Sequence, residues 1–166
     1  MSATEFAVPA EDRYFEDYAP GAVFEYGAIP VTETEIVEFA GRFDPQYIHI
    51  DRERAVQGPF GGLIASGWHT AAMMMRLIVD NSLPQRASLG SPGIDELRWL
   101  KPVRPGDVLS IRLSVLEVTR SRSKPDRGVV RTLCEVLNQD REVVLSLRAM
   151  NIIACRNAEG GRNPRI

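Results

Sequence analysis

The sequence predicts an α+β fold in which one long helix covers an antiparallel sheet. Hydrophobic residues surround the run at about 63–83 on all sides, which predicts a long buried helix. From Gly90 onward the hydrophobic period changes to alternation, which predicts four long strands joined by short turns. Consecutive strands of this kind favour an antiparallel meander, and the preceding apolar helix is the natural element to cover one of its faces.

Turn and capping signals place the first strand and the first helix. A Pro-Gly turn at 20–21 is followed by rough alternation, which predicts a strand at about 22–29. Thr32 and Glu35 then form a capping box, in which the hydroxyl of Thr32 satisfies a free amide and Glu35 reaches back. This helix should end just before Pro45, which lacks an amide proton and restricts the residue before it.

A glycine-rich segment separates the first helix from the long one. We expect this segment to be irregular after Pro45, and we expect the long helix to end before Pro84. Turn signals at 104–107, 123–128 and 138–140 divide the second half of the chain. The four strands are expected in the segments 94–103, 107–120, 127–139 and 141–155.

Composition and length predict one domain. The chain has 166 residues, of which 44% are hydrophobic and 25% charged, as in ordinary globular proteins. We expect the domain at 14–155, between a flexible lead at 1–13 and a flexible tail at 156–166. The net charge of −2 provides no basic field for nucleic acid or an anionic membrane. No secretion signal is evident, so we expect a cytoplasmic protein.

The sequence offers few groups for metal or redox chemistry. Cys134 and Cys155 fit neither a disulfide framework nor a metal-ligand spacing, so we interpret both as buried small apolar residues. His49 and His69 are the only two histidines. They are therefore the only candidates for acid–base chemistry by an imidazole.

Asp44 and His49 are separated by a proline turn in the segment FDPQYIHID. A carboxylate and an imidazole this close can share one small molecule, such as a water. Such a pair can exchange protons near neutral pH, because an imidazole titrates at about pH 6.5 and burial can raise the pKa of a carboxylate. The spacing equally fits a structural arrangement, in which Asp44 caps a turn and His49 bonds to a backbone carbonyl.

Ser66 and Gly67 open the run of good helix formers. A glycine at the entry of a buried helix leaves an unpaired amide exposed, and this amide, at the positive end of the helix dipole, can hold a developing oxyanion. Alternatively, Gly67 simply permits close packing against the sheet.

Several separated motifs carry a family resemblance. FDPQYIHID, GPFGGLIASGWHTAAMMMRL, ELRWLKPVRPGDVL and SRSKPDRGVVR follow one another in the order and spacing of the MaoC-like dehydratases, also called R-specific enoyl-CoA hydratases or hydratase 2. The chain resembles this family from about Tyr14 to Ala154. The resemblance implies a hot-dog fold, in which an antiparallel sheet wraps around a long central helix and a second copy normally pairs across a two-fold axis.

The resemblance also implies a chemistry. In the family, the Asp and His of an Asp-x4-His motif hold the catalytic water and serve as general base and general acid in hydration of a trans-2-enoyl thioester. Those positions match Asp44 and His49. The family glycine whose amide meets the thioester carbonyl matches Gly67. The resemblance implies no metal or redox cofactor, and coenzyme A enters only as part of the substrate.

The chain departs from the family pattern at two positions. Ser66 stands where many members have histidine, and Met75 stands where some hydratases have an additional serine. A flexible apolar side chain at 75 implies a differently shaped acyl pocket. These departures concern the identity of the substrate more than the class of reaction.

Other side chains complete the predicted site. Gln46 and Tyr47 either line its mouth or pack the turn, Trp68 is a core or pocket-wall residue, and Ser66 and Met75 join them as substrate-binding candidates. We interpret His69 as a packing or dimer-contact residue. The local cations that could meet coenzyme A phosphates, or simply be solvated, are Arg98, Lys101, Arg104, Arg120, Arg122 and Lys124.

Three functions are consistent with these features. The first is a hydro-lyase that reversibly hydrates a 2-enoyl-CoA to a 3-hydroxyacyl-CoA, acting as a homodimer or a dimer-based larger oligomer. An acyl-CoA thioesterase of this fold would use a carboxylate at the start of the central helix, yet no Asp or Glu occurs between Glu53 and Asp80. A non-catalytic acyl-CoA-binding protein is opposed only by the complete set of Asp44, His49 and Gly67.

Overall fold

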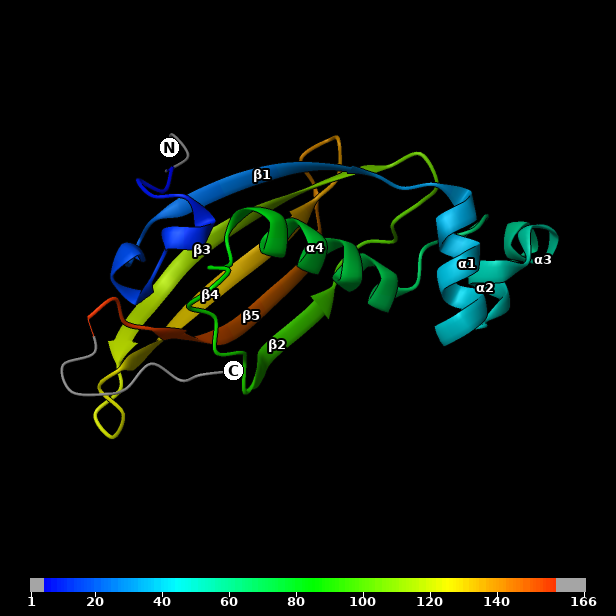
Figure 1. Ribbon diagram of the computed structural model, residues 1–166. Helices are drawn as coiled ribbons and strands as arrows, with labels where there is room; N and C mark the ends of the chain where they lie inside the picture. The colour runs from blue at the N-terminus through cyan, green and yellow to red at the C-terminus, as the bar shows by residue number, and fades with distance from the viewer. Residues whose placement is uncertain (1–4, 158–166) are drawn as a thin grey trace.

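The computed structural model describes residues 5–157 and contains one five-stranded sheet. The strands are β1 (Val23–Pro30), β2 (Gly93–Trp99), β3 (Val108–Arg120), β4 (Arg127–Leu137) and β5 (Val143–Ala154), and the helices are α1 (Glu33–Phe43), α2 (Tyr47–Ile50), α3 (Arg52–Gln57) and α4 (Gly67–Asn81). All neighbouring strands are antiparallel. Figure 1 shows α4 lying across one face of the sheet, with α1, α2 and α3 grouped beyond one end. This confirms the predicted α+β architecture.

Helix α1 begins and ends where the sequence predicts. The hydroxyl of Thr32 accepts a hydrogen bond from the amide of Glu35 at 3.2 Å, and the Glu35 carboxylate accepts one from the amide of Thr32 at 3.4 Å. At the other end, Pro45 removes the next amide donor, so Asp44 leaves helical geometry and becomes the cap. The polar segment that carries chemistry therefore starts at a defined helix exit.

The predicted meander is correct for three strands and wrong for β2. The sheet order is β1-β3-β4-β5-β2, so β2 pairs with β5 at an edge instead of with β3. The connection 100–107 contains two prolines and crosses the fold without forming a hairpin. Its backbone bonds elsewhere: Val103 accepts from Ala65 at 2.8 Å, and Gly106 donates to Val31 at 2.8 Å.

Helix α4 is shorter than the predicted run at 63–83, and it is not buried on every side. Trp68 is 58% exposed, and Met75 and Val79 are each 44% exposed. Hydrophobicity alone cannot distinguish a side that packs on the sheet from an apolar side that remains open. The side that packs on the core carries Met73, Met74, Leu77 and Ile78.

The segment after Pro45 is more ordered than we predicted. It forms the two short helices α2 and α3 in place of an irregular stretch. Asp51 separates them and caps α3, because its carboxylate accepts from the amide of Arg54 at 3.0 Å. The glycines that favoured an irregular segment follow α3 at 58–62.

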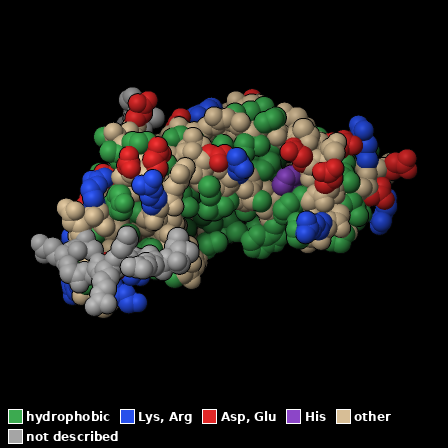
Figure 2. Space-filling view, in the orientation of Figure 1, with side chains coloured by type: hydrophobic (Ala, Val, Ile, Leu, Met, Phe, Trp, Pro, Cys, Tyr) green, Lys and Arg blue, Asp and Glu red, His purple; other side chains and the backbone are tan. Residues whose placement is uncertain are grey.

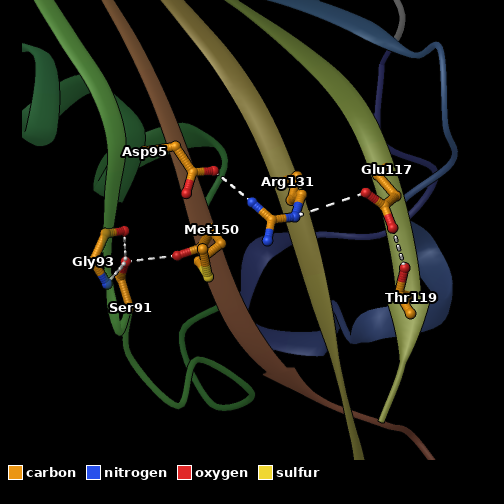
Figure 3. A network of polar contacts seen from close by, with 7 residues as sticks. All are labelled: Ser91, Gly93, Asp95, Glu117, Thr119, Arg131 and Met150. Atoms are coloured by element: carbon orange, nitrogen blue, oxygen red, sulfur yellow. Dashed lines mark hydrogen bonds and ion pairs between the residues drawn. The ribbon is translucent and has the colours of Figure 1, made fainter.

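Polar side chains join several strands of the sheet. Arg131 on β4 pairs with Asp95 on β2 and, at 3.7 Å, with Glu117 on β3 (Figure 3). The hydroxyl of Ser91 donates to the carbonyl of Met150 at 2.6 Å, which ties the entry of β2 to β5. These contacts hold the edge strand in register.

Arg13 caps the C-terminal end of α4 and is only 5% exposed. Its guanidinium donates to the carbonyls of Asn81 at 3.0 Å and Ser82 at 2.8 Å. The predicted boundaries at 13 and 155 stay predictions, and residues 1–4 and 158–166 of the predicted lead and tail lie outside the described residues. Among residues 5–157, no helix is long and apolar enough to cross a membrane.

Replacing Arg13 by alanine should destabilise the fold. The change removes the charged donor to the carbonyl of Asn81 and leaves the carbonyl of Ser82 with the hydroxyl of Tyr18, so we expect the free energy of unfolding to fall by about 1.5–3 kcal/mol. Urea denaturation measures this loss. Arg86→Ala, at an exposed arginine, is the matched control and should change stability by less than about 0.5 kcal/mol. Equal effects of the two changes would contradict the capping role.

Candidate active site

Asp44 is held at the end of α1 by two side-chain donors. Gln46 Nε2 donates to Oδ1 at 2.7 Å, and Ser66 Oγ donates to Oδ2 at 2.7 Å. The side chain of Asp44 retains 20% exposure. Both oxygens of the carboxylate are therefore fixed, while part of it still faces open space.

Two side-chain donors and burial act on the pKa of Asp44 in opposite directions. Hydrogen bonds from Gln46 and Ser66 lower the pKa of this carboxyl below its ordinary value, and they outweigh the opposing effect of burial. The upward shift that burial can cause is therefore not the net result at Asp44. Asp44 is an ionised acceptor at neutral pH.

His49 faces Asp44 from α2 and is only 4% exposed. Its Nδ1 lies 2.7 Å from the carbonyl oxygen of Ile64, and because a carbonyl can only accept, Nδ1 carries a proton. Nε2 is then the atom that gains or loses a proton, and it lies 3.3 Å from Asp44 Oδ2. The sequence left two alternatives for His49, a hydrogen bond to a backbone carbonyl and a pairing with the carboxylate of Asp44. His49 makes both contacts.

The pair opens into a cavity of about 430 Å³. A neutral imidazole with a free Nε2 and an ionised carboxylate are both acceptors, so a water bound between them can donate to either. When His49 is protonated, Nε2 can donate to the carboxylate directly. The cavity is lined by Asp44, Gln46, His49, Phe60, Ile64, Ala65, Gly67, Trp68, Thr70, Trp99, Leu100, Lys101, Pro102 and Val103.

Gly67 brings the start of α4 to the same cavity. Ser66 satisfies two of the first amides of the helix, since its Oγ accepts from Trp68 at 3.3 Å and its carbonyl accepts from Thr70 at 3.0 Å. Within residues 5–157, no group accepts a hydrogen bond from the amide of Gly67. This amide, at the positive end of the helix dipole, is available to a ligand oxygen.

Close packing also requires glycine at 67. A Cβ atom there would overlap the indole ring of Trp99, whose Nε1 is the nearest atom. The rings of Trp99 and Trp68 meet edge to face with centroids 5.3 Å apart. Free amide and tight packing, the two alternatives that the sequence left open, therefore occur together.

Three of the predicted substrate-binding residues, Ser66, Tyr47 and Met75, do not line this cavity. Ser66 is fully buried and bonds to Asp44 from behind the cavity. Tyr47 packs under the guanidinium of Arg54 at 4.8 Å, outside the cavity lining. Met75 lines a different cavity. His69 is buried against the ring of Phe39, and burial lowers its pKa.

A second, apolar cavity of about 410 Å³ lies between α4 and the sheet. Trp68 lines both cavities, and Met74, Met75 and Ile78 line the second one from α4. Figure 2 shows hydrophobic side chains gathered in the hollowed area beneath α4. An apolar space beside a polar one is suited to a ligand with an apolar chain and a polar reactive end.

Two contributors to the polar cavity carried no sequence signal. Ile64 acts through its backbone carbonyl, which any residue possesses. Trp99 reaches Gly67 from the edge strand β2, and its place depends on a strand order that the sequence did not predict.

Comparisons of sequence and of structure find similar proteins in one family. The family model described as "MaoC like domain" matches residues 17–136. The crystal structure of a MaoC-like dehydratase from Rhodospirillum rubrum is 44% identical, covers 88% of this chain and 99% of that chain, and superposes with a TM-score of 0.82. The R-hydratase PhaJ1 from Pseudomonas aeruginosa is 27% identical, with coverage of 92% and 94% and a TM-score of 0.70.

A further relative carries a named activity. The 3-hydroxybutyryl-CoA dehydratase of Methylorubrum extorquens is 31% identical over 139 residues, which is 82% of each chain. The family model's match at residues 17–136 includes both the segment that carries Asp44 and His49 and the helix that begins at Gly67. The chain belongs to the MaoC-like dehydratase family and has the hot-dog fold of its hydratase and dehydratase neighbours.

Proposed function

We propose that the protein reversibly adds water to a trans-2-enoyl-CoA thioester and forms a 3-hydroxyacyl-CoA. The observation that carries this proposal is the 3.3 Å contact between Asp44 Oδ2 and His49 Nε2, in a cavity that also reaches the free amide of Gly67. Polar addition of water to a conjugated thioester requires a base, an acid and an oxyanion donor. The relatives named as acyl-thioester dehydratases support the same reaction class.

The two titratable groups can complete one catalytic cycle. Ionised Asp44 takes a proton from water as the new C–O bond forms at the β-carbon. The π electrons move to the thioester oxygen, and the resulting enolate is stabilised by the amide of Gly67. Protonated His49 then delivers a proton to the α-carbon. Asp44 returns its proton to Nε2 across 3.3 Å, so the net change is one added water.

The remaining predicted residues receive supporting roles in this proposal. The cavity beneath α4 accommodates the acyl chain, with Trp68 and Met75 as its walls. Gln46 orients Asp44 through the bond to Oδ1. Coenzyme A is part of the substrate, and the chemistry uses no other cofactor.

The thioesterase alternative is less well supported. Among residues 5–157, Asp44 is the only carboxylate that lines the polar cavity, and it caps the end of α1 instead of lying at the start of α4. A hydrolase would release free coenzyme A, whereas a hydratase keeps the thioester intact. A non-catalytic binder would change neither bond.

We also propose that two copies associate along β2. This strand is an edge of the sheet, and Ile94 at 55% and Leu100 at 52% exposure lie on or next to it. The exposed side of α4 adds Met75 and Val79 to the apolar surface. Light scattering on the purified protein should give the mass of a dimer or a multiple of it.

A substrate panel tests the function. The purified protein is mixed with trans-2-enoyl-CoAs of varied length and branching, and loss of the conjugated enoyl absorbance is followed in parallel with release of free thiol. We expect absorbance to fall with no thiol released. Thiol release without hydration would support the thioesterase, and no change in either signal would support the binder.

A further inference from the structure

Ser66 joins two parts of the site that are distant in sequence. Its side chain is completely buried at the entry of α4, and its Oγ lies 2.7 Å from Oδ2 of Asp44. The same Oγ accepts from the amide of Trp68 at 3.3 Å. One hydroxyl therefore touches both the carboxylate that caps α1 and the first turn of α4.

The direction of these hydrogen bonds follows from the donors available. The amide of Trp68 can only donate, so Ser66 Oγ is the acceptor in that bond and its single proton is directed to Asp44. The bond thus suits an ionised carboxylate. The titratable side chain that faces the same Oδ2 is His49, and Gln46 occupies Oδ1.

We propose that Ser66 is a positioning residue that fixes Asp44 relative to the oxyanion amide of Gly67. This inference rests on the proposed function and replaces the substrate contact predicted from the sequence. Ser66 does not line the cavity, so it acts through Asp44 and the helix start instead of through the substrate. Hydration requires that Asp44 hold the water near the β-carbon of the substrate while the amide of Gly67 holds the thioester carbonyl oxygen. If the carboxylate shifted relative to this amide, the two groups could not act on the same bound substrate.

The bond from Ser66 also contributes to the lowered pKa of Asp44. A donor to a carboxylate stabilises its charged form, and Ser66 is the second of the two donors that lower the pKa of Asp44. A depressed pKa means that the base remains ionised until the pH falls through that lowered value. Removing the donor should bring the loss of activity on the acid side to higher pH.

Ser66→Ala and Ser66→Thr test the proposal on the enoyl-CoA that the wild-type protein hydrates best. We expect alanine to lower kcat by about 10- to 100-fold, the equivalent of one charge-assisted hydrogen bond, with a smaller change in KM. The acid limb of the kcat/KM profile should move to higher pH. Threonine keeps the hydroxyl and should restore most of kcat and the wild-type acid limb.

Asp51→Ala is the matched control for helix capping. Asp51 caps α3 through the amide of Arg54 and lies outside the cavity lining, so its loss should cost about 1 kcal/mol of stability and leave the pH profile unchanged. If Ser66→Ala loses only stability in the same way, with kcat and the acid limb unchanged, the positioning role is refuted.

A readout without turnover separates this inference from the proposed function. The pKa of Asp44 can be followed by ¹³C NMR of the carboxyl carbon, with Asp44→Asn used for assignment. Ser66→Ala should raise this pKa whether or not the protein hydrates the substrates tried. An unchanged pKa would overturn the role of Ser66. Absence of hydration by the wild type, with the pKa raised in Ser66→Ala, would instead contradict only the proposed function.

Discussion

Asp44→Asn is expected to reduce kcat for enoyl-CoA hydration by about 10³-fold, because general acid–base catalysis of this kind contributes about 10²–10⁴. Asparagine keeps the size of the side chain and can still accept at its oxygen, but it cannot take a proton from water. The measurement is the initial rate of loss of enoyl absorbance at saturating substrate.

His49→Ala should have an effect of similar size by removing the acid. The carbonyl of Ile64 then loses its partner, so this variant should also unfold more easily, whereas Asp44→Asn should lose only the stability that the lowered pKa of Asp44 supplies at neutral pH. Urea denaturation of both variants separates lost chemistry from lost fold. Full activity in both variants would refute the assignment of the pair.

The lowered pKa of Asp44 also makes the stability of the fold depend on pH. A carboxyl whose pKa is lower in the folded state stabilises the fold above its unfolded pKa and loses that contribution as the pH falls through the folded value. The stability of Asp44→Asn should therefore approach that of the wild type in strong acid. The catalytic base itself stays ionised throughout the neutral range.

Gly67→Ala is expected to be the second severe change. The added methyl group overlaps the indole of Trp99, so either the ring or the start of α4 must move. Overpacking of this kind costs about 1–3 kcal/mol of stability. Displacement of the oxyanion amide should reduce kcat by about 10²-fold or more, as loss of one oxyanion donor does in other enzymes. Denaturation and hydration kinetics measure the two effects.

A double variant distinguishes the effect of overpacking against Trp99 from an effect on the amide of Gly67. Alanine retains the backbone N–H, so Gly67→Ala combined with Trp99→Ala should recover stability and part of kcat relative to Gly67→Ala alone. Gly41→Ala is the matched control, since a Cβ there meets nothing within 4 Å in the exposed part of α1. It should leave kcat unchanged and stability unchanged or slightly increased. Wild-type kinetics in Gly67→Ala would contradict the close approach of Trp99.

Local signals in the sequence predicted the parts of the fold that local physics controls. The capping box of Thr32 and Glu35 and the restriction imposed by Pro45 set both ends of α1 through neighbouring atoms, and the structure confirms them. Cys134 and Cys155 were expected to be buried because they fit no disulfide or metal-ligand spacing, and both are buried and free. Alternation likewise located the strands within a few residues.

Features that depend on distant contacts were not predictable in the same way. The place of β2 beside β5 depends on where the connection 100–107 finds its hydrogen bonds, and no local pattern encodes that choice. The role of Ser66 depends on a partner 22 residues away. The pKa of Asp44 depends on donors that tertiary structure supplies, and so its direction could not be read from burial alone.

Mass spectrometry of the acyl-CoA, after incubation of the purified protein with a trans-2-enoyl-CoA in ¹⁸O-labelled water, tests whether the protein is a hydratase. We expect an intact thioester that has gained one molecule of labelled water, at a rate that Asp44→Asn reduces by about 10³-fold. An unchanged enoyl-CoA across the panel, or free coenzyme A with a labelled carboxylic acid, would contradict this expectation.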